Sequence, residues 1–270
     1  MKLTKLFLVG ALSTSALFAH SMWINSFESD SKNGKRVSIG LGWGNKAPID
    51  DSLNSDFGMK SFILTTPDNK SIELKPPVKN PENIFKDDLL SINESNIAMQ
   101  KIGLNKKSPN GTYSLGFQLP EFTLSEYINK KGKKSKSIKK IEKIRDLKEH
   151  ISTTVTTISS KSYFTYKNYS EVKAFGHDLE IIPDGDYTKL KEGDIITLNV
   201  LLKGKALESG YLLAKSSDDQ NINYFHGRVR DGKVKFYLNS NGQWIFKITH
   251  TQNKEKTIYK YKTSASINIK

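Results

Sequence analysis

Residues 193–202, Gly-Asp-Ile-Ile-Thr-Leu-Asn-Val-Leu-Leu, contain the clearest structural pattern of the chain. Ile196, Leu198, Val200 and Leu202 recur at every second position. Because successive side chains of an extended strand point to opposite faces, this spacing places all four on one face. The stretch is therefore predicted to be a β-strand with one buried side.

The same pattern continues from this stretch to the C-terminus. Short alternating runs are separated by turn-forming residues, among them Asp231-Gly232, a dipeptide typical of tight hairpins. The apolar members of these runs are Tyr211 to Ala214, then Val234, Phe236 and Leu238, then Trp244, Phe246 and Ile248, and finally Tyr259, Tyr261, Ala265, Ile267 and Ile269. About six or seven short strands at such spacing predict a small immunoglobulin-like sandwich over residues 184–270.

Strand patterns also occupy the chain before this region. Residues 62–64 and 72–74 flank a Pro67-Asp68-Asn69 turn, as in a hairpin, and Tyr113 to Leu119 alternate again. No amphipathic helices alternate with the strands, which excludes a parallel α/β fold. The prediction is therefore an all-β protein.

The clearest interruption of the strand pattern is Pro183-Asp184-Gly185-Asp186. We place a domain boundary there, which gives two β-sandwich-like domains. The N-terminal β domain is expected to span residues 20–183, and the immunoglobulin-like domain residues 184–270.

The first 19 residues have the layout of a secretory signal peptide. Two lysines precede a mostly apolar run from Leu6 to Ala19, which is too short to span a bilayer comfortably. Small residues gather near its end, so cleavage after Ala19 is expected, with a cut after Ala16 as the open alternative. The mature protein is expected to begin at His20 and to be soluble and periplasmic.

A lysine-rich segment carries most of the positive charge. The whole chain holds 42 Lys and Arg against 28 Asp and Glu, a formal net charge of +14. Residues 130–148 alone hold ten basic and two acidic side chains. Ile138, Ile141, Ile144 and Leu147 recur three apart, which predicts a short basic helix in an insertion spanning about 126–150.

This lysine-rich segment differs from a nucleic-acid site. Base readout and stacking use arginine and aromatic side chains, and residues 130–148 contain one arginine and no aromatic residue. We therefore expect no nucleic-acid partner. The segment is either a solvated loop or a contact to an anionic surface, either a membrane or an acidic partner. Its contact residues would be Lys130, Lys131, Lys133, Lys134, Lys136, Lys139 and Lys140.

The chain contains no cysteine, so a bound metal must be held by nitrogen and oxygen atoms. It also lacks the phosphate-loop, dinucleotide-binding, HExxH and GxSxG motifs, which argues against the common enzyme classes that use them. An enzyme with a dispersed site stays open on this ground.

Four of the five histidines are candidate metal ligands. As the first residue of a mature protein, His20 offers its α-amine and its imidazole to one ion, a chelate suited to Ni(II), Co(II) or Cu(II). His177, His226 and His250 are candidate further ligands, although each also has a structural interpretation as a turn, surface or core residue. His150 has a sufficient structural role at the C-terminus of the predicted helix.

Several short motifs together resemble the DUF4198 family over nearly the whole mature chain except the insertion. They are His20-x-x-Trp23, Gly42-Trp43-Gly44-Asn45-x-x-Pro48-x-Asp50-Asp51, Gly176-x-x-Leu179-Glu180-Ile181-Ile182-Pro183, Leu190-x-x-Gly193-Asp194, Gly204-Lys205-Ala206-Leu207 and Gly242-x-Trp244. Members of this family commonly carry His where Asn45 stands and Pro where Ala206 stands.

The resemblance implies an exported protein of the kind often described as a periplasmic component of nickel or cobalt uptake. The function expected is non-catalytic binding of Ni(II) or Co(II), with Cu(II) less favoured, and delivery to a membrane metal transporter or outer-membrane receptor. Two alternatives remain open. One is a structural adaptor that docks through the lysine-rich segment. The other is a copper-dependent oxidative enzyme with an N-terminal histidine site.

Overall fold

The structure, a computed structural model, describes residues 20–45, 48, 50, 53, 58–77, 83–86, 91–93, 97–219 and 224–270. The predicted signal peptide, residues 1–19, lies outside this part of the chain. The described residues form β-strands and two 3-10 helices, η2 (Ile141–Lys143) and η3 (Tyr187–Lys189). None of their helices is long and apolar enough to cross a membrane. The prediction of an all-β, β-sandwich-like fold is confirmed.

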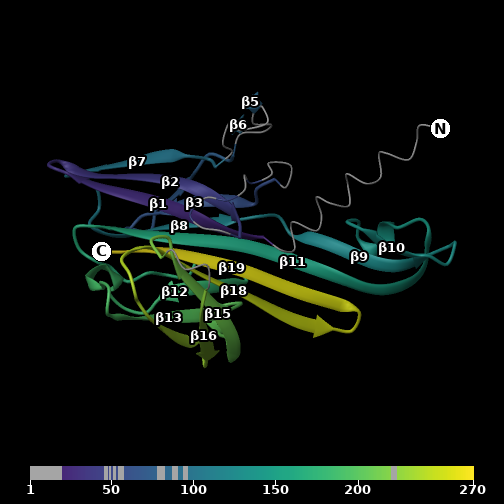
Figure 1. Cartoon of the computed structure of the whole chain (residues 1–270). Coiled ribbons are helices and arrows are strands. Elements are labelled where there is room, and N and C mark those ends of the chain that lie inside the picture. Colours follow the sequence, from purple (N-terminus) through teal and green to yellow (C-terminus); the bar gives the residue numbers. More distant parts are fainter. Residues whose placement is uncertain are drawn as a thin grey trace.

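The strands form a small sheet, a large sheet and a separate hairpin (Figure 1). The small sheet contains β1 (Ser21–Ser31), β2 (Gly34–Gly44) and β7 (Gln100–Asn105), and the hairpin contains β5 (Asn83–Lys86) and β6 (Ser91–Asn93). The first strands of the large sheet are β3 (Ser61–Thr65), β4 (Ser71–Glu73), β8 (Gly111–Gln118), β9 (Phe122–Asn129), β10 (Lys134–Ser137), β11 (Leu147–Tyr166) and β12 (Leu179–Pro183). The others are β13 (Ile195–Leu202), β14 (Lys205–Ala206), β15 (Ser209–Ser216), β16 (Phe225–Arg230), β17 (Lys233–Tyr237), β18 (Gly242–Lys254) and β19 (Thr257–Ile269).

Two long neighbours, β11 and β19, lie in the middle of the large sheet and pair in parallel. On the other edge of β11, β8 and β9 pair with it, and β18 pairs with the other edge of β19. Two hydrophobic cores result. One is shared by the small sheet and β3, β8 and β11, and the other by β11 to β19. Strand β11 therefore contributes to both cores.

The large sheet folds back on itself. Strand β12 lies at one end of the strand order, yet the Tyr163 hydroxyl on β11 donates to the carbonyl of Ile181 on β12, at 2.9 Å. Strand β12 also pairs with β13, so the chain on both sides of the predicted 183/184 boundary belongs to one sheet. That boundary stays a prediction.

The lysine-rich insertion is built mainly from strands. Residues 122–129 and 134–137 pair as the β9–β10 hairpin, and only Ile141–Lys143 forms a helical turn. The predicted basic helix is thus reduced to one 3-10 turn. The physical reason is that the end of the isoleucine and leucine stripe joins the sheet: the Lys130 N–H donates to the Asp146 carbonyl, at 2.8 Å, and Leu147 begins β11 opposite Asn129 of β9. Lys134 and Lys136, two apart on β10, hold the hairpin through ion pairs with Glu126, at 3.0 and 2.8 Å.

Strand β1 lies along the face of β19 and is held there by side chains. On β19, Lys262 Nζ, Ser264 Oγ and Asn268 Nδ2 donate to the backbone carbonyls of His20, Met22 and Ser26. The donor–acceptor distances are 3.2, 2.6 and 3.0 Å. Because donors and acceptors share the same spacing, β1 runs parallel to β19, and its start is fixed beside Lys262.

Candidate functional site

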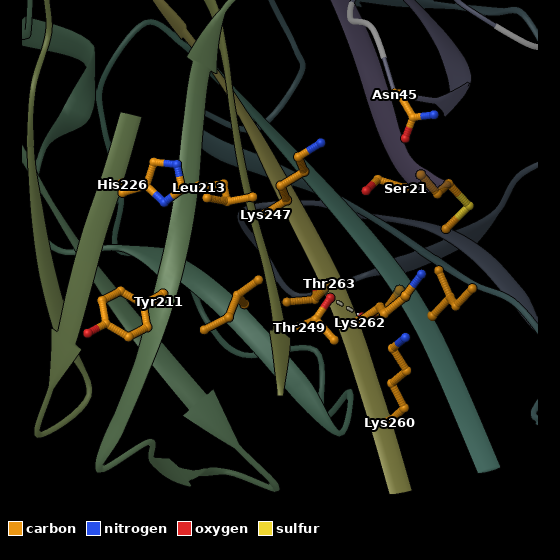
Figure 2. A pocket seen from close by; sticks show the side chains of 14 residues that line it. Ser21, Asn45, Tyr211, Leu213, His226, Lys247, Thr249, Lys260, Lys262 and Thr263 are labelled. Atoms are coloured by element: carbon orange, nitrogen blue, oxygen red, sulfur yellow. Dashed lines mark hydrogen bonds between the residues drawn. The ribbon is translucent and has the colours of Figure 1, made fainter. Parts of the chain in front are cut away.

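A cleft of about 540 Å³ opens where the start of β1 meets β15, β16, β18 and β19 (Figure 2). This volume is in the range of small-molecule sites. The lining residues are Ser21, Met22, Asn45, Ile158, Ser159, Tyr211, Leu213, His226, Lys247, Ile248, Thr249, Lys260, Lys262 and Thr263. Most of their polar groups are hydrogen-bond donors or cations.

Three lysines from two neighbouring strands give the cleft its charge. Lys247 lies on β18, and Lys260 and Lys262 lie on β19, where Thr249 pairs with Lys262. Burial lowers the pKa of Lys247 to about 8, and Lys215 acts in the same direction. Burial also lowers the pKa of Lys262 to about 8, helped by the charges of Lys260 and Lys247. Both stay largely protonated at pH 7.

One wall of the cleft is tied together by Tyr224, the residue before β16. The Tyr224 hydroxyl donates to the carbonyl of Asn45, at 2.7 Å, and Lys247 Nζ lies 3.8 Å from the centre of its ring. The backbone N–H of Asn45 donates to Asp50, at 2.7 Å. This network positions Asn45, which follows β2, against the strands of the C-terminal core.

One of the predicted metal ligands lines this cleft, and a second lies next to a lining residue. His226, an exposed residue of β16, is part of the lining. His20 directly precedes the lining residue Ser21, its carbonyl accepts from Lys262, and its ring lies 5.8 Å from that of Trp43, centroid to centroid. The fold thus places His226 and Asn45 in the cleft lining, and His20 one residue before the lining residue Ser21.

His177 lies in a different, buried environment. Its ring stacks on Phe175, with centroids 5.5 Å apart, next to the buried ion pair between Lys161 and Glu180. The Glu180 carboxylate also accepts from the backbone N–H groups of Phe175 and Gly176, at 2.9 and 2.6 Å. Burial, together with the charges of Lys161 and Lys60, lowers the pKa of His177 to about 4. The ring is therefore neutral at pH 7.

The remaining histidines lie outside the cleft lining. His250 is on β18, opposite Tyr261 of β19, and burial lowers the pKa of its ring. His150, on β11, shares a hydrogen bond of 2.9 Å with the Thr153 hydroxyl. Among the described residues, no three His, Asp or Glu side chains form a group that could hold a metal ion. His20, His177, His226 and His250 are thus not gathered into one metal centre there.

The cleft lysines were not identified from the sequence. Each occupies a position that alternates with apolar residues, as solvent-facing strand positions do. The available signal is that Lys247 lies between Phe246 and Ile248 in a predicted strand, while Lys260 and Lys262 share one face of the last strand. Which faces of these strands are partly covered is decided by packing between distant parts of the chain.

Comparison with known proteins places the chain in a family. The family model described as "Domain of unknown function (DUF4198)" matches residues 17–252, which include every residue of the cleft lining except Lys260, Lys262 and Thr263. Comparison with curated proteins finds no match. The chain therefore belongs to the DUF4198 family.

Proposed function

We propose that this protein is an exported, non-catalytic metal-binding protein that takes up Ni(II) or Co(II) at the rim of the cleft. By the rim we mean His20, Asn45 and His226. It then delivers the ion to a membrane transporter or outer-membrane receptor. The observation that supports this function is that His226 lines the cleft and that His20, far away in the sequence, directly precedes the lining residue Ser21 and bonds through its carbonyl to the lining residue Lys262. Export and cleavage before His20 are part of the proposal.

The ligand chemistry follows from the residues at this rim. A mature N-terminus at His20 supplies an amine and an imidazole nitrogen, and His226 supplies a second imidazole. Nickel and cobalt accept such nitrogen ligands readily. Asn45, in the cleft lining, stands where members of the DUF4198 family commonly carry His. Its amide oxygen is a weaker ligand for nickel than an imidazole nitrogen.

The proposal predicts that metal affinity depends on a free amine at His20. The mature protein, starting at His20, is titrated calorimetrically with Ni(II), Co(II) and Cu(II) beside a form with one extra alanine before His20. In the extended form the new amine joins the imidazole in a chelate only if the intervening amide loses its proton, which Ni(II) and Co(II) promote much less readily than Cu(II), so Ni(II) affinity at pH 7 should fall by about tenfold or more. Asn45→His adds a nitrogen ligand and should tighten binding.

His150→Ala serves as the control, because His150 lies outside the cleft lining. It should bind metal as the unmodified protein does. Equally weak binding by the mature and extended forms contradicts the proposal.

A second function is favoured by the β9–β10 hairpin. It projects at one end of the molecule, and the seven lysines from Lys130 to Lys140 are all exposed (Figure 1). Beside them, the apolar side chain of Ile138 is 68% exposed. This combination suits an adaptor that docks on an anionic membrane surface.

A further inference from the structure

We call the part of the cleft formed by Lys247, Lys260 and Lys262 its floor. Its positive charges and hydrogen-bond donors are those that bind anions. Three lysines face the cleft together with hydroxyl groups, and the lining contains no aspartate or glutamate within the described part of the chain. The hydroxyl groups belong to Ser21, Ser159, Tyr211, Thr249 and Thr263. Asp50 bonds the backbone of Asn45 but is not part of the lining. A cleft so rich in donors is matched by a ligand rich in acceptors.

The lysines are held in place by the fold. Lys247 packs over the Tyr224 ring, and Lys262 donates to the carbonyl of His20. Neither Lys247 nor Lys260 forms an ion pair with another described residue. Placing like charges together in a half-buried cleft is unfavourable, and a bound anion offsets that cost.

We propose that Lys247, Lys260 and Lys262 bind a small multivalent oxyanion, of the carboxylate or phosphate class, on the floor of the cleft. Lysine is a compact point charge with three rotatable donors, so three lysines accommodate oxygen atoms at several positions. The cleft volume of about 540 Å³ admits an organic anion of several carboxylates.

This anion site rests on its own residues and does not require the metal of the proposed function. If both ligands bind, the dication at the rim and the anion on the floor attract each other. Each then tightens the binding of the other by the same factor.

The test uses citrate and inorganic phosphate as probes of the two anion sources. Each is titrated calorimetrically into the mature protein at pH 7 and constant ionic strength. Lys247→Met and Lys262→Met remove one charge each while keeping a long apolar side chain. Lys235→Met, at an exposed position of β17 outside the cleft, is the matched control.

We expect saturable binding of at least one probe, with about a tenfold loss of affinity in each cleft variant and none in Lys235→Met. Tighter citrate binding identifies a carboxylate site, and tighter phosphate binding a phosphate site. Absence of saturable binding, or equal losses in all three variants, overturns the inference. Should a cleft variant fail to fold, Lys260→Met replaces it, with the same expected loss.

The two proposals fail separately. Citrate binding by a protein that does not bind Ni(II) removes the proposed function and leaves the anion site. Nickel binding at His20 without saturable anion binding removes the anion site and leaves the proposed function.

Discussion

At the scale of single residues, His177 shows how a buried titratable group couples stability to pH. Its ring lies beside Lys161 and is neutral at pH 7, because burial and nearby positive charge lower its pKa to about 4. In the unfolded chain the same ring takes up a proton near its ordinary value of 6.5. Between these two values the unfolded state binds more protons, so folding becomes less favourable as pH falls.

We predict that the free energy of unfolding decreases by up to about 3 kcal/mol from this group as pH falls from 7 to 4. His177→Phe keeps a ring that can stack on Phe175 and removes the titration. Urea unfolding at several pH values should therefore show a flatter dependence for His177→Phe than for the unmodified protein. His226→Phe, at an exposed site, is the control, and a similar flattening in it would refute the assignment.

At the scale of single elements, the position of β1 depends on the row of donors along β19. The Ser264 hydroxyl donates to the Met22 carbonyl, and both groups are buried. On the same strand, Ser266 is equally buried, yet its hydroxyl has no hydrogen-bond partner in the described structure. The two serines therefore form a matched pair.

Ser264→Ala should lower the free energy of unfolding by about 1–3 kcal/mol, because the buried Met22 carbonyl loses its donor and the buried Ser160 hydroxyl loses its partner. Ser266→Ala should leave it nearly unchanged or raise it slightly, because no bond is lost. Urea unfolding at pH 7 measures both. Equal losses in the two variants would show that the row of donors does not hold β1.

Single elements also show which turns, strands and helices could be predicted from the sequence. The Asp231-Gly232 hairpin was predicted correctly because its turn is local, and both residues adopt positive φ, 48° and 75°. The helix in the insertion is shorter than predicted, because isoleucines three apart occur in strands and loops as well as helices, and the pairing of Leu147 with Asn129 of β9 has no local signal. His20 and His226 were identified by ligand chemistry, but the long-range packing that sets His226 in a cleft beside the start of β1 has no local signal.

At the scale of the whole molecule, the parallel β11–β19 pair joins the two hydrophobic cores. Residues 153–163 pair with residues 257–267, and no local signal in the sequence indicates that contact. Because β11 pairs with β9, the lysine-rich hairpin is an extension of the large sheet. None of its residues lines the cleft, so the two surfaces can be tested independently.

We predict that docking on membranes depends on the hairpin alone. Changing Lys130, Lys131 and Lys140 to Gln should strongly reduce co-sedimentation with anionic phosphatidylglycerol vesicles, since each lysine near such a surface contributes about 1 kcal/mol. Changing the exposed Lys191, Lys205 and Lys235 to Gln removes the same charge at other places on the surface. These changes should have little effect on co-sedimentation with the vesicles. If both triple variants lose binding equally, net charge is responsible and the hairpin is not a docking element.

The central claim, that the cleft is the functional site, is tested most directly by locating a bound metal. Crystals of the mature protein grown with Ni(II) can be measured at the nickel absorption edge, where an anomalous difference peak marks the ion. The account predicts a peak within bonding distance of the His20 amine and imidazole, beside His226. A peak at His177 or His250 instead, or none at His20 in a protein fully exposed to Ni(II), would contradict it.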